Sequence, residues 1–362
     1  MSDFFPILCF DHLEFYVGNA KQAASFYETL FGFTNTAYRG LATGSRKVAS
    51  YVMEQGAIRF VLSTPLSPDH PIAHRILKHG DHIAVIALAV PDAVQAYKQV
   101  TARGAIGAIP PTIAEDESGL MHYAAIHAFG DVLIKFVDRH AYEGVFAPEF
   151  RPQPIARNGG VGLQTIDHVV SNLELGAMER WVKFFAETMG FQLLVQFDDK
   201  AISTEYSALM SKVMQNGSGM IKLPINEPAI GKRTSQIQEY LDYHQGPGIQ
   251  HVALSTKNMI ETVMQLHEAG VNFLHVPMTY YDDLDARIGK IDEPIDQLAD
   301  LGILVDRDQE GYLLQIFTQP VEDRPTLFFE IIERRGAQSF GEGNFKSLFE
   351  AIEREQALRG NL

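Results

Sequence analysis

The chain has 362 residues, 46% hydrophobic and 21% charged, a balance typical of a soluble globular protein of about two domains. Its 30 Lys and Arg against 45 Asp and Glu give a formal net charge of −15, which argues against nucleic-acid or anionic-membrane partners. The single cysteine, Cys9, excludes an internal disulfide and any CxxC motif, so a metal would need His and carboxylate ligands. With no apolar run of about 18 residues and no signal-like start, we expect a cytoplasmic protein.

Three short motifs occur twice, once on each side of a Pro- and Gly-rich linker over 147–162. They are FDH at 10–12 with IDH at 166–168, HIA at 82–84 with HVA at 251–253, and GDVLIKF at 130–136 with GYLLQIF at 311–317. The first two motifs are each followed by a stretch of helical character that runs to a glycine. We therefore predict two domains, 1–150 and 151–362, each built from two strand–helix–strands units.

The pattern within each unit predicts a short strand, a helix of about twelve residues and further strands bounded by Gly, Pro and Asn. Typical strand runs are 58–63, 220–225, 313–318 and 327–332. Four copies of such a unit predict an α+β architecture, with curved sheets that close around a cavity.

The end of the chain predicts an amphipathic helix over 344–362. Gly341 and Gly343 precede it and suit a hinge that lets the helix cover the cavity. An ordinary packed helix with a flexible lead-in is the alternative.

Three polar residues interrupt apolar strand runs in the second half. His168 lies in IDH, His251 in GIQHVAL and Glu330 in LFFEII. Two imidazoles and one carboxylate on one face are the ligands of many iron(II) dioxygenases, because they leave three coordination positions open. A carboxylate within such a strand is costly to bury unless it is paired or metal-bound. The alternatives are satisfied core histidines and an ion pair between Glu330 and Arg334.

Long ordered motifs show a family resemblance from about residue 10 to the end of the chain. VGNAKQAASFYE, LPINEPAIGKRTSQIQEYLDY, GIQHVAL, LGILVDRD, GYLLQIFTQPVEDRPTLFFEIIER and FGEGNFKSLFEAIE resemble the 4-hydroxyphenylpyruvate dioxygenase family. The resemblance implies a vicinal-oxygen-chelate fold, with four βαβββ modules forming two open-barrel domains. The N-terminal domain would be structural, and the C-terminal domain would be catalytic and carry the gating helix.

The resemblance also implies the chemistry. His168, His251 and Glu330 would hold one Fe(II) per subunit. The enzyme would convert 4-hydroxyphenylpyruvate and O₂ to homogentisate and CO₂ in the catabolism of tyrosine and phenylalanine. Members of the family are homodimers or homotetramers.

Polar and aromatic side chains around the substrate are implied in the same way. The polar residues Ser211, Asn226, Gln236 and Gln315 would take part in catalysis, and Phe317, Phe328, Phe340, Asn344 and Phe345 would bind the substrate. Strand alternation agrees in part, since it places Gln315 with Phe317 and Phe328 with Glu330. Gln250 is adjacent to His251, so a regular strand would point it to the opposite face, and we leave it out. Without the family, Gln236 at a helix start could equally be a surface residue.

Other readings stay open. The first half has His12 and His82 at positions matched to His168 and His251, and Glu149 suggests a second metal site, although Pro148 argues against a regular strand there. The nearest functional rival is 4-hydroxymandelate synthase, which uses the same ligands and substrate but hydroxylates the benzylic carbon. More remote rivals are an extradiol catechol dioxygenase and a metal-free ligand-binding protein of the same fold.

Overall fold

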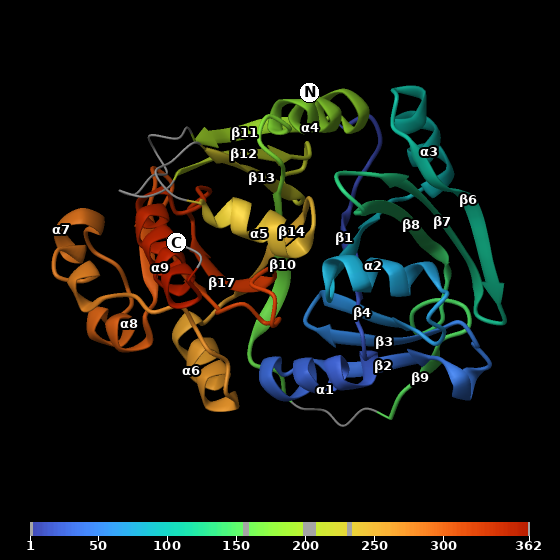
Figure 1. Cartoon of the computed structure of the whole chain (residues 1–362), viewed down its shortest axis with the longest axis horizontal. Helices are drawn as coiled ribbons and strands as arrows, with labels where there is room; N and C mark the ends of the chain where they lie inside the picture. Colours follow the sequence, from blue (N-terminus) through green and yellow to red (C-terminus); the bar gives the residue numbers. More distant parts are fainter. Residues whose placement is uncertain (1–2, 155–158, 198–207, 230–233, 361–362) are drawn as a thin grey trace.

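Two curled sheets lie side by side in the computed structural model, which describes residues 3–154, 159–197, 208–229 and 234–360 (Figure 1). The strands of the first sheet are β1 (Cys9–Tyr16), β2 (Thr34–Arg39), β3 (Val48–Gln55), β4 (Ile58–Pro65), β5 (His82–Ala89), β6 (Gly107–Asp116), β7 (Gly119–His127), β8 (Leu133–Tyr142) and β9 (Arg151–Pro152). Those of the second are β10 (Leu163–Asn172), β11 (Gln192–Phe197), β12 (Ala208–Gln215), β13 (Lys222–Ala229), β14 (Gly248–Thr256), β15 (Leu304–Arg307), β16 (Tyr312–Phe317) and β17 (Phe328–Arg335). Their orders are β6-β7-β8-β5-β1-β4-β3-β2-β9 and β11-β12-β13-β10-β14-β17-β16-β15.

The helices divide the strands into four repeated modules. They are α1 (Ala20–Phe31), α2 (Pro71–His79), α3 (Ala93–Ala102), α4 (Met178–Phe184), α5 (Gln236–His244), α6 (Met259–Ala269), α7 (Leu284–Ile288), α8 (Ile295–Leu301) and α9 (Glu342–Leu358). The order βαβββ occurs as β1-α1-β2-β3-β4, β5-α3-β6-β7-β8, β10-α4-β11-β12-β13 and β14-α6-β15-β16-β17. The predicted fold of four βαβββ modules in two open barrels is therefore confirmed.

Local sequence sets where three of the module helices begin. The side chains of Asn19, Asp92 and Asn258 accept hydrogen bonds from backbone N–H groups in the first turns of α1, α3 and α6. These bonds satisfy amides that have no partner within a helix. Gly32 ends α1 at a φ of 69°, a left-handed conformation that glycine adopts without strain.

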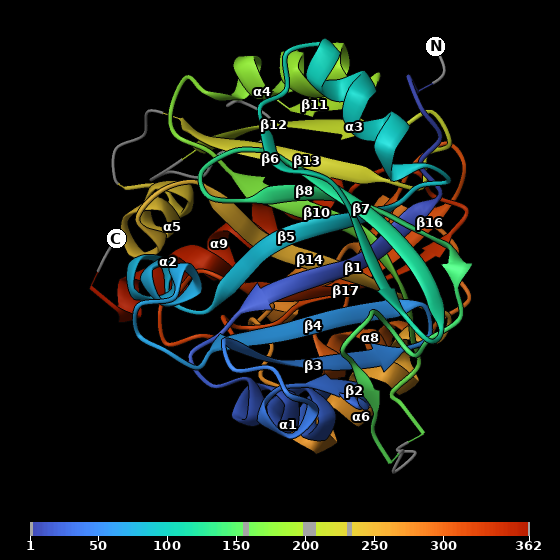
Figure 2. The same ribbon diagram turned by 90° about the vertical axis from the view of Figure 1, so that its right-hand side faces the viewer.

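The main hydrophobic core lies between the two sheets. In Figure 2 the first sheet faces the viewer, with strands of the second behind it. The Phe329 ring of β17 lies 5.2 Å from the ring of Phe31 and 5.9 Å from that of Phe60, so both halves contribute to one aromatic cluster. Because successive side chains on a strand point to opposite faces, Phe328 and Glu330 point away from this core, into the second barrel.

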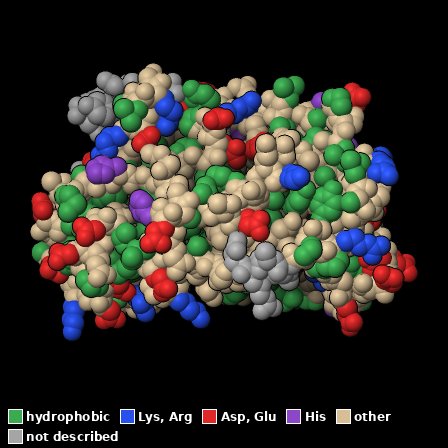
Figure 3. Space-filling model, turned by 90° about the horizontal axis from the view of Figure 1, so that it is seen from below, with side chains coloured by type: hydrophobic (Ala, Val, Ile, Leu, Met, Phe, Trp, Pro, Cys, Tyr) green, Lys and Arg blue, Asp and Glu red, His purple; other side chains and the backbone are tan. Residues whose placement is uncertain are grey.

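The predicted C-terminal helix is present as α9, but it begins at Glu342 and ends at Leu358, so that Gly343 lies in its first turn and only Gly341 precedes it. Residues 361–362 lie outside the described part of the chain. The linker contains β9, which pairs with β2, and the domain boundary at 150–151 stays a prediction. No helix within the described residues is long and apolar enough to span a membrane. On the face in Figure 3, acidic side chains lie among basic and apolar ones and do not gather in one patch.

Glu322 gives the fold a pH dependence. Burial, together with the nearby Asp81 and Asp323 carboxylates, raises the pKa of Glu322 from 4.5 to about 8. Between these values the folded chain keeps a proton that the unfolded chain has released, so stability falls as pH rises through this window. At pH 8 the free energy of unfolding of Glu322→Gln should therefore exceed that of the wild type by roughly 1–3 kcal/mol, and the variant should unfold at a higher temperature. At pH 5 the two proteins should differ little. Thermal unfolding at both pH values checks this; parallel pH profiles for the two proteins would contradict it.

Candidate metal centre and substrate cavity

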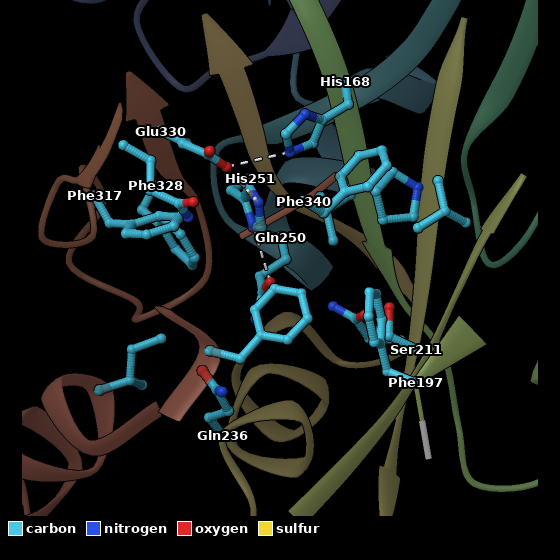
Figure 4. A pocket seen from close by; sticks show the side chains of 17 residues that line it. His168, Phe197, Ser211, Gln236, Gln250, His251, Phe317, Phe328, Glu330 and Phe340 are labelled. Atoms are coloured by element: carbon cyan, nitrogen blue, oxygen red, sulfur yellow. Dashed lines mark hydrogen bonds and ion pairs between the residues drawn. The ribbon is translucent and has the colours of Figure 1, made fainter. Parts of the chain in front are cut away.

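Three neighbouring strands of the second sheet bring the predicted metal ligands together. β10 carries His168, β14 carries His251 and β17 carries Glu330, and all three side chains are buried (Figure 4). Glu330 Oε2 lies 3.2 Å from His168 Nε2 and 3.6 Å from His251 Nε2. One possible ligand atom from each residue lies within 4.8 Å of the other two. The structure therefore brings together the three residues that the sequence predicted as metal ligands.

Two bulges place a polar side chain beside each histidine. The ladder between β10 and β14 shifts register at Asp167 and at Gln250, neither of which has a partner across it. A bulge inserts an extra residue and interrupts the alternation of side chains. The prediction that Gln250 points away from His251 is wrong for this reason. Gln250 lines the cavity, and its Oε1 lies 3.0 Å from His251 Nδ1.

These neighbours fix which histidine nitrogens face the centre. His168 Nδ1 lies 2.8 Å from Asp167 Oδ1, and because an ionised carboxylate can only accept a hydrogen bond, Nδ1 carries the proton and donates. The Gln250 oxygen accepts from His251 Nδ1 in the same way. Both Nε2 atoms, which lie next to Glu330, are thus left with lone pairs for a metal, an arrangement common among metal-bound histidines.

Arg334 holds Asp167 in place. Its Nε and Nη2 donate to the two Asp167 oxygens at 2.8 and 2.9 Å, and its Nη1 donates to the Ser339 carbonyl at 2.6 Å. The alternative that Glu330 forms an ordinary ion pair with Arg334 is wrong, because the partner of Arg334 is Asp167 and Glu330 faces the histidines.

The charges of the centre favour a bound cation. Burial alone would raise the pKa of Asp167, but Arg334 and His168 hold it well below its usual range. Burial would likewise raise the pKa of Glu330, yet the two histidines lower it, so the carboxylate is ionised. Burial lowers the pKa of His251, which favours a neutral ligand, whereas Glu330 and Asp167 outweigh burial and raise that of His168. A buried carboxylate between two imidazoles fits a divalent transition metal.

A cavity of about 620 Å³, part of which is open to solvent, adjoins the three residues. It is lined by the ligands and by Val170, Phe197, Ser211, Val213, Pro224, Asn226, Gln236, Gln250, Gln315, Phe317, Phe328, Phe340, Phe345 and Ile352. Eight of the nine substrate-site residues predicted from the sequence are therefore brought together, all except Asn344. Phe345 and Ile352 belong to α9, so the C-terminal helix covers the cavity in this structure.

Aromatic rings surround the metal side of the cavity. The ring of His251 stacks on Phe328 at 4.7 Å, and that of His168 meets the edge or face of Phe340 at 5.1 Å. Phe197, which the sequence analysis missed, packs against Phe345 at 4.8 Å. Only its place at the end of an apolar strand could have indicated it.

Polar groups lie across the cavity from the metal side. Figure 4 shows Gln236 and Ser211 well away from Glu330, on α5 and β12. Gln236 is 6% exposed, so it is not a surface residue. Its Oε1 is buried, and no donor among the described residues reaches it. An acceptor left free in this way is costly unless a ligand supplies the donor.

Asn344 lies one layer behind the cavity. It is fully buried, its Oδ1 accepts from Tyr280 Oη at 2.6 Å, and its Nδ2 donates to Gln315 Oε1 at 3.3 Å. Asn344 therefore orients the Gln315 amide and ties the start of α9 to the second barrel.

The first half does not repeat the ligand set. Its strands β1, β5 and β8 pair in the same register as β10, β14 and β17, which places Val85 at the position of His251 and Lys135 at that of Glu330. The match of His82 to His251 is wrong by three residues. Glu149 lies outside the strands. Only His168, His251 and Glu330 form a group of three potential metal ligands in the described part of the chain.

Comparisons with known proteins agree with the fold and the site. The model of the Glyoxalase/Bleomycin resistance protein/Dioxygenase superfamily matches residues 10–123 and 165–316. Proteins named 4-hydroxyphenylpyruvate dioxygenase from Yarrowia lipolytica and Dictyostelium discoideum are 45% and 46% identical, over 98% of this chain and 93% and 99% of theirs. A solved mutant of 4-hydroxymandelate synthase from Streptomyces coelicolor has a TM-score of 0.87 and 32% identity, covering 97% of this chain and 100% of that one.

The βαβββ modules and the buried His–His–Glu group define an enzyme of the glyoxalase and dioxygenase class with a candidate metal centre. Within that class, the full-length matches show that the chain belongs to the 4-hydroxyphenylpyruvate dioxygenase family.

Proposed function

We propose that the chain is an iron(II) enzyme that converts 4-hydroxyphenylpyruvate and O₂ to homogentisate and CO₂. The observation that carries the proposal is the ionised, buried Glu330 between His168 and His251 at a cavity wall, in a chain about 45% identical to relatives of that name. Two imidazoles and a carboxylate with open positions are typical of non-haem Fe(II) oxygenases. A metal-free binding protein of this fold would have no use for the buried carboxylate.

The residues of the chain prepare the centre and the substrate. The chemistry supplied by bound iron is chelation of the 2-oxo acid and activation of O₂. Asp167 and Gln250 fix the histidine rings so that both Nε2 atoms face one point. Phe328 and Phe340 enclose the metal side and exclude water, which strengthens electrostatic interactions there.

The far polar groups orient the substrate ring. We assign the phenol hydroxyl to the side of Ser211, Asn226 and Gln236, because the free Gln236 oxygen needs a donor and a phenol O–H supplies one. Phe317 and Phe345 also line the cavity, the first beside His251 and the second beside Phe197, and both suit the faces of the ring.

Gln236→Leu should lower kcat/KM for 4-hydroxyphenylpyruvate by roughly 10- to 100-fold, because the phenol hydroxyl would be buried without its partner. Iron content should stay at the wild-type level. Gln238→Leu is the matched control on the same helix, since the Gln238 amide donates to Asp242 at the surface. Steady-state kinetics of both variants check this, and an equal effect of the two substitutions would contradict the assignment.

4-Hydroxymandelate synthase activity is the second candidate, because the solved structure with a TM-score of 0.87 is a mutant of such an enzyme. The lower identity to it, 32% against 45% for the Yarrowia relative, favours the dioxygenase. Chromatography of the product separates the two candidates: homogentisate supports the proposal, and 4-hydroxymandelate replaces it with the second.

We further propose that the halves are a structural domain over 1–150 and a catalytic domain over 151–362. The presence of the ligand triad in the second barrel alone, among the described residues, supports this division of roles. By family resemblance, the enzyme is proposed to be a cytoplasmic homodimer or homotetramer.

A further inference from the structure

The first barrel contains a pocket of about 1050 Å³, part of which is open to solvent, and none of its lining residues lines the catalytic cavity. It is lined by His12, Glu14, Arg39, Ser50, Val61, Ile109, Ala114, Glu115, Met121, Tyr123, Lys135, Phe146, Ala147, Pro148, Glu149 and Phe150. The walls thus combine aromatic and aliphatic side chains with a few polar ones, a composition typical of small-molecule sites.

The polar residues of this cavity occupy the positions of the catalytic residues in the second barrel. Lys135 takes the place of Glu330, because the β5–β8 register repeats that of β14–β17. Ser50 takes the place of Ser211 in the same way, since it pairs with β4 as Ser211 pairs with β13. The first barrel therefore has a cation where the second has its buried anion.

The support around this position is the same in both barrels. Asp11 Oδ1 lies 2.5 Å from His12 Nδ1, and Arg139 donates from Nε and Nη2 to the two Asp11 oxygens at 2.8 Å. This repeats the contacts of Asp167 with its own histidine and arginine. The second barrel has an anionic side chain, Glu330, at this position and suits a cation. The first barrel has a cationic side chain, Lys135, at the same position and suits an anion.

Lys135 lacks an anionic partner. Its Nζ lies 4.8 Å from the centroid of the Tyr123 ring, and no carboxylate of the described residues lies within 4.0 Å of it. Burial lowers the pKa of Lys135, although Glu14 and Asp11 oppose this effect from farther away. The Lys135 side chain is partly buried. An ammonium group partly removed from water without a close counter-ion is costly, so binding of an anion beside it would be favourable.

The other charged groups of the cavity lie farther from Lys135 or at the rim. The carboxylate of Glu14 accepts from Ser63 Oγ at 2.7 Å, and Ser63 Oγ lies 2.8 Å from Ser50 Oγ. Arg39 also lines the cavity. Its Nη1 lies 3.5 Å from Glu149 Oε2, whereas its Nε is buried with no acceptor among the described residues. Glu115 and Glu149 are exposed and belong to the rim.

We propose that this cavity binds a small carboxylic acid with an aromatic or other apolar body. The carboxylate accepts hydrogen bonds from the Lys135 ammonium, with Arg39 Nε as a further donor. The body packs against the apolar wall formed by Val61, Met121, Phe146 and Phe150. The site is independent of the metal centre and of the proposed reaction.

Phenylacetate is a suitable probe, titrated into the full-length, metal-free protein and followed by ligand-observed NMR. We expect saturable binding at one site per chain. Lys135→Met should weaken it by about tenfold or more, because a charge-assisted hydrogen bond is lost. Ala114→Trp, which places an indole in the cavity from strand β6 and keeps Lys135 unchanged, should weaken it similarly. Val170→Phe fills the catalytic cavity instead and should leave the affinity unchanged.

Unfolding curves establish whether each variant is folded. If only one of Lys135→Met and Ala114→Trp folds, that variant alone is sufficient for the test. Absence of saturable binding to the wild type would overturn the proposal. Wild-type affinity in the folded first-barrel variants would also overturn it, as would loss of binding in Val170→Phe alone.

Discussion

Glu330→Ala should reduce turnover of 4-hydroxyphenylpyruvate by about a thousandfold or more, since the metal loses its one anionic ligand and several kcal/mol of transition-state stabilisation with it. Metal content after dialysis should fall in parallel. The metal-free variant should unfold within a few degrees of the metal-free wild type, because removing a desolvated charge offsets the lost contacts with the histidines. Iron analysis, steady-state rates and thermal unfolding of the same preparations give these three values.

A matched control is Glu322→Gln, which alters a largely buried carboxyl outside the cavity. It should keep wild-type iron content and rate. If Glu330→Ala retained bound iron and more than a few per cent of the activity, Glu330 would not be a ligand. If it failed to fold while Glu322→Gln folded, Glu330→Gln would repeat the test with the shape of the side chain preserved.

Asp167→Asn should have the second largest effect, because Asp167 contacts both a ligand and Arg334. Loss of the carboxylate leaves the Arg334 guanidinium buried without its counter-ion, which should lower the free energy of unfolding by about 3–5 kcal/mol. It also leaves one amide oxygen to serve both His168 Nδ1 and Arg334, and the new NH₂ group can donate to Nδ1 and favour the other His168 tautomer, which should weaken iron binding by about 10- to 100-fold. Denaturant unfolding and anaerobic iron titration measure the two effects separately.

The chain supplies its own control for this experiment. Asp11 makes the same contacts with His12 and Arg139 in the first barrel. Asp11→Asn should therefore cost similar stability but leave iron affinity unchanged. If both variants weakened iron binding equally, Asp167 would act only through general stability and not through the orientation of His168.

The metal ligands could be predicted from the sequence because their surroundings are restrictive. Glu330 stands within an apolar run, where an ordinary solvated carboxylate does not fit, and His168 and His251 lie in strands of the same kind. The repeated FDH and IDH motifs also indicated the duplication that became four βαβββ modules. The apolar pattern around each of these residues is local in the chain, so it can be recognised in a single sequence.

The bulges were not predictable in the same way. Strict alternation placed Gln250 opposite His251, but a bulge depends on the pairing of two strands about 85 residues apart in sequence. Only the polar side chains that precede both histidines, Asp167 and Gln250, could have suggested a shared local geometry. The role of Arg334 was hidden for a similar reason, since its partner Asp167 lies far away in the chain.

Short sequence matches between the two halves differ from the alignment that the strand register gives. HIA at 82–84 resembles HVA at 251–253, yet the strand register aligns VIAL at 85–88 with HVAL at 251–254. The pairing of GDVLIKF with GYLLQIF is wrong by one strand, because the first belongs to β8, which corresponds to β17. The correspondence between Lys135 and Glu330 therefore follows only from the strand register.

The most direct test of the account is a single-turnover experiment. The protein is loaded anaerobically with Fe(II) and 4-hydroxyphenylpyruvate, mixed with O₂, and analysed for homogentisate and CO₂ per iron. The account predicts one homogentisate and one CO₂ for each O₂ consumed, and neither product from Glu330→Ala. Homogentisate formation that persists at the wild-type level in Glu330→Ala, or CO₂ released with another aromatic product, would contradict it.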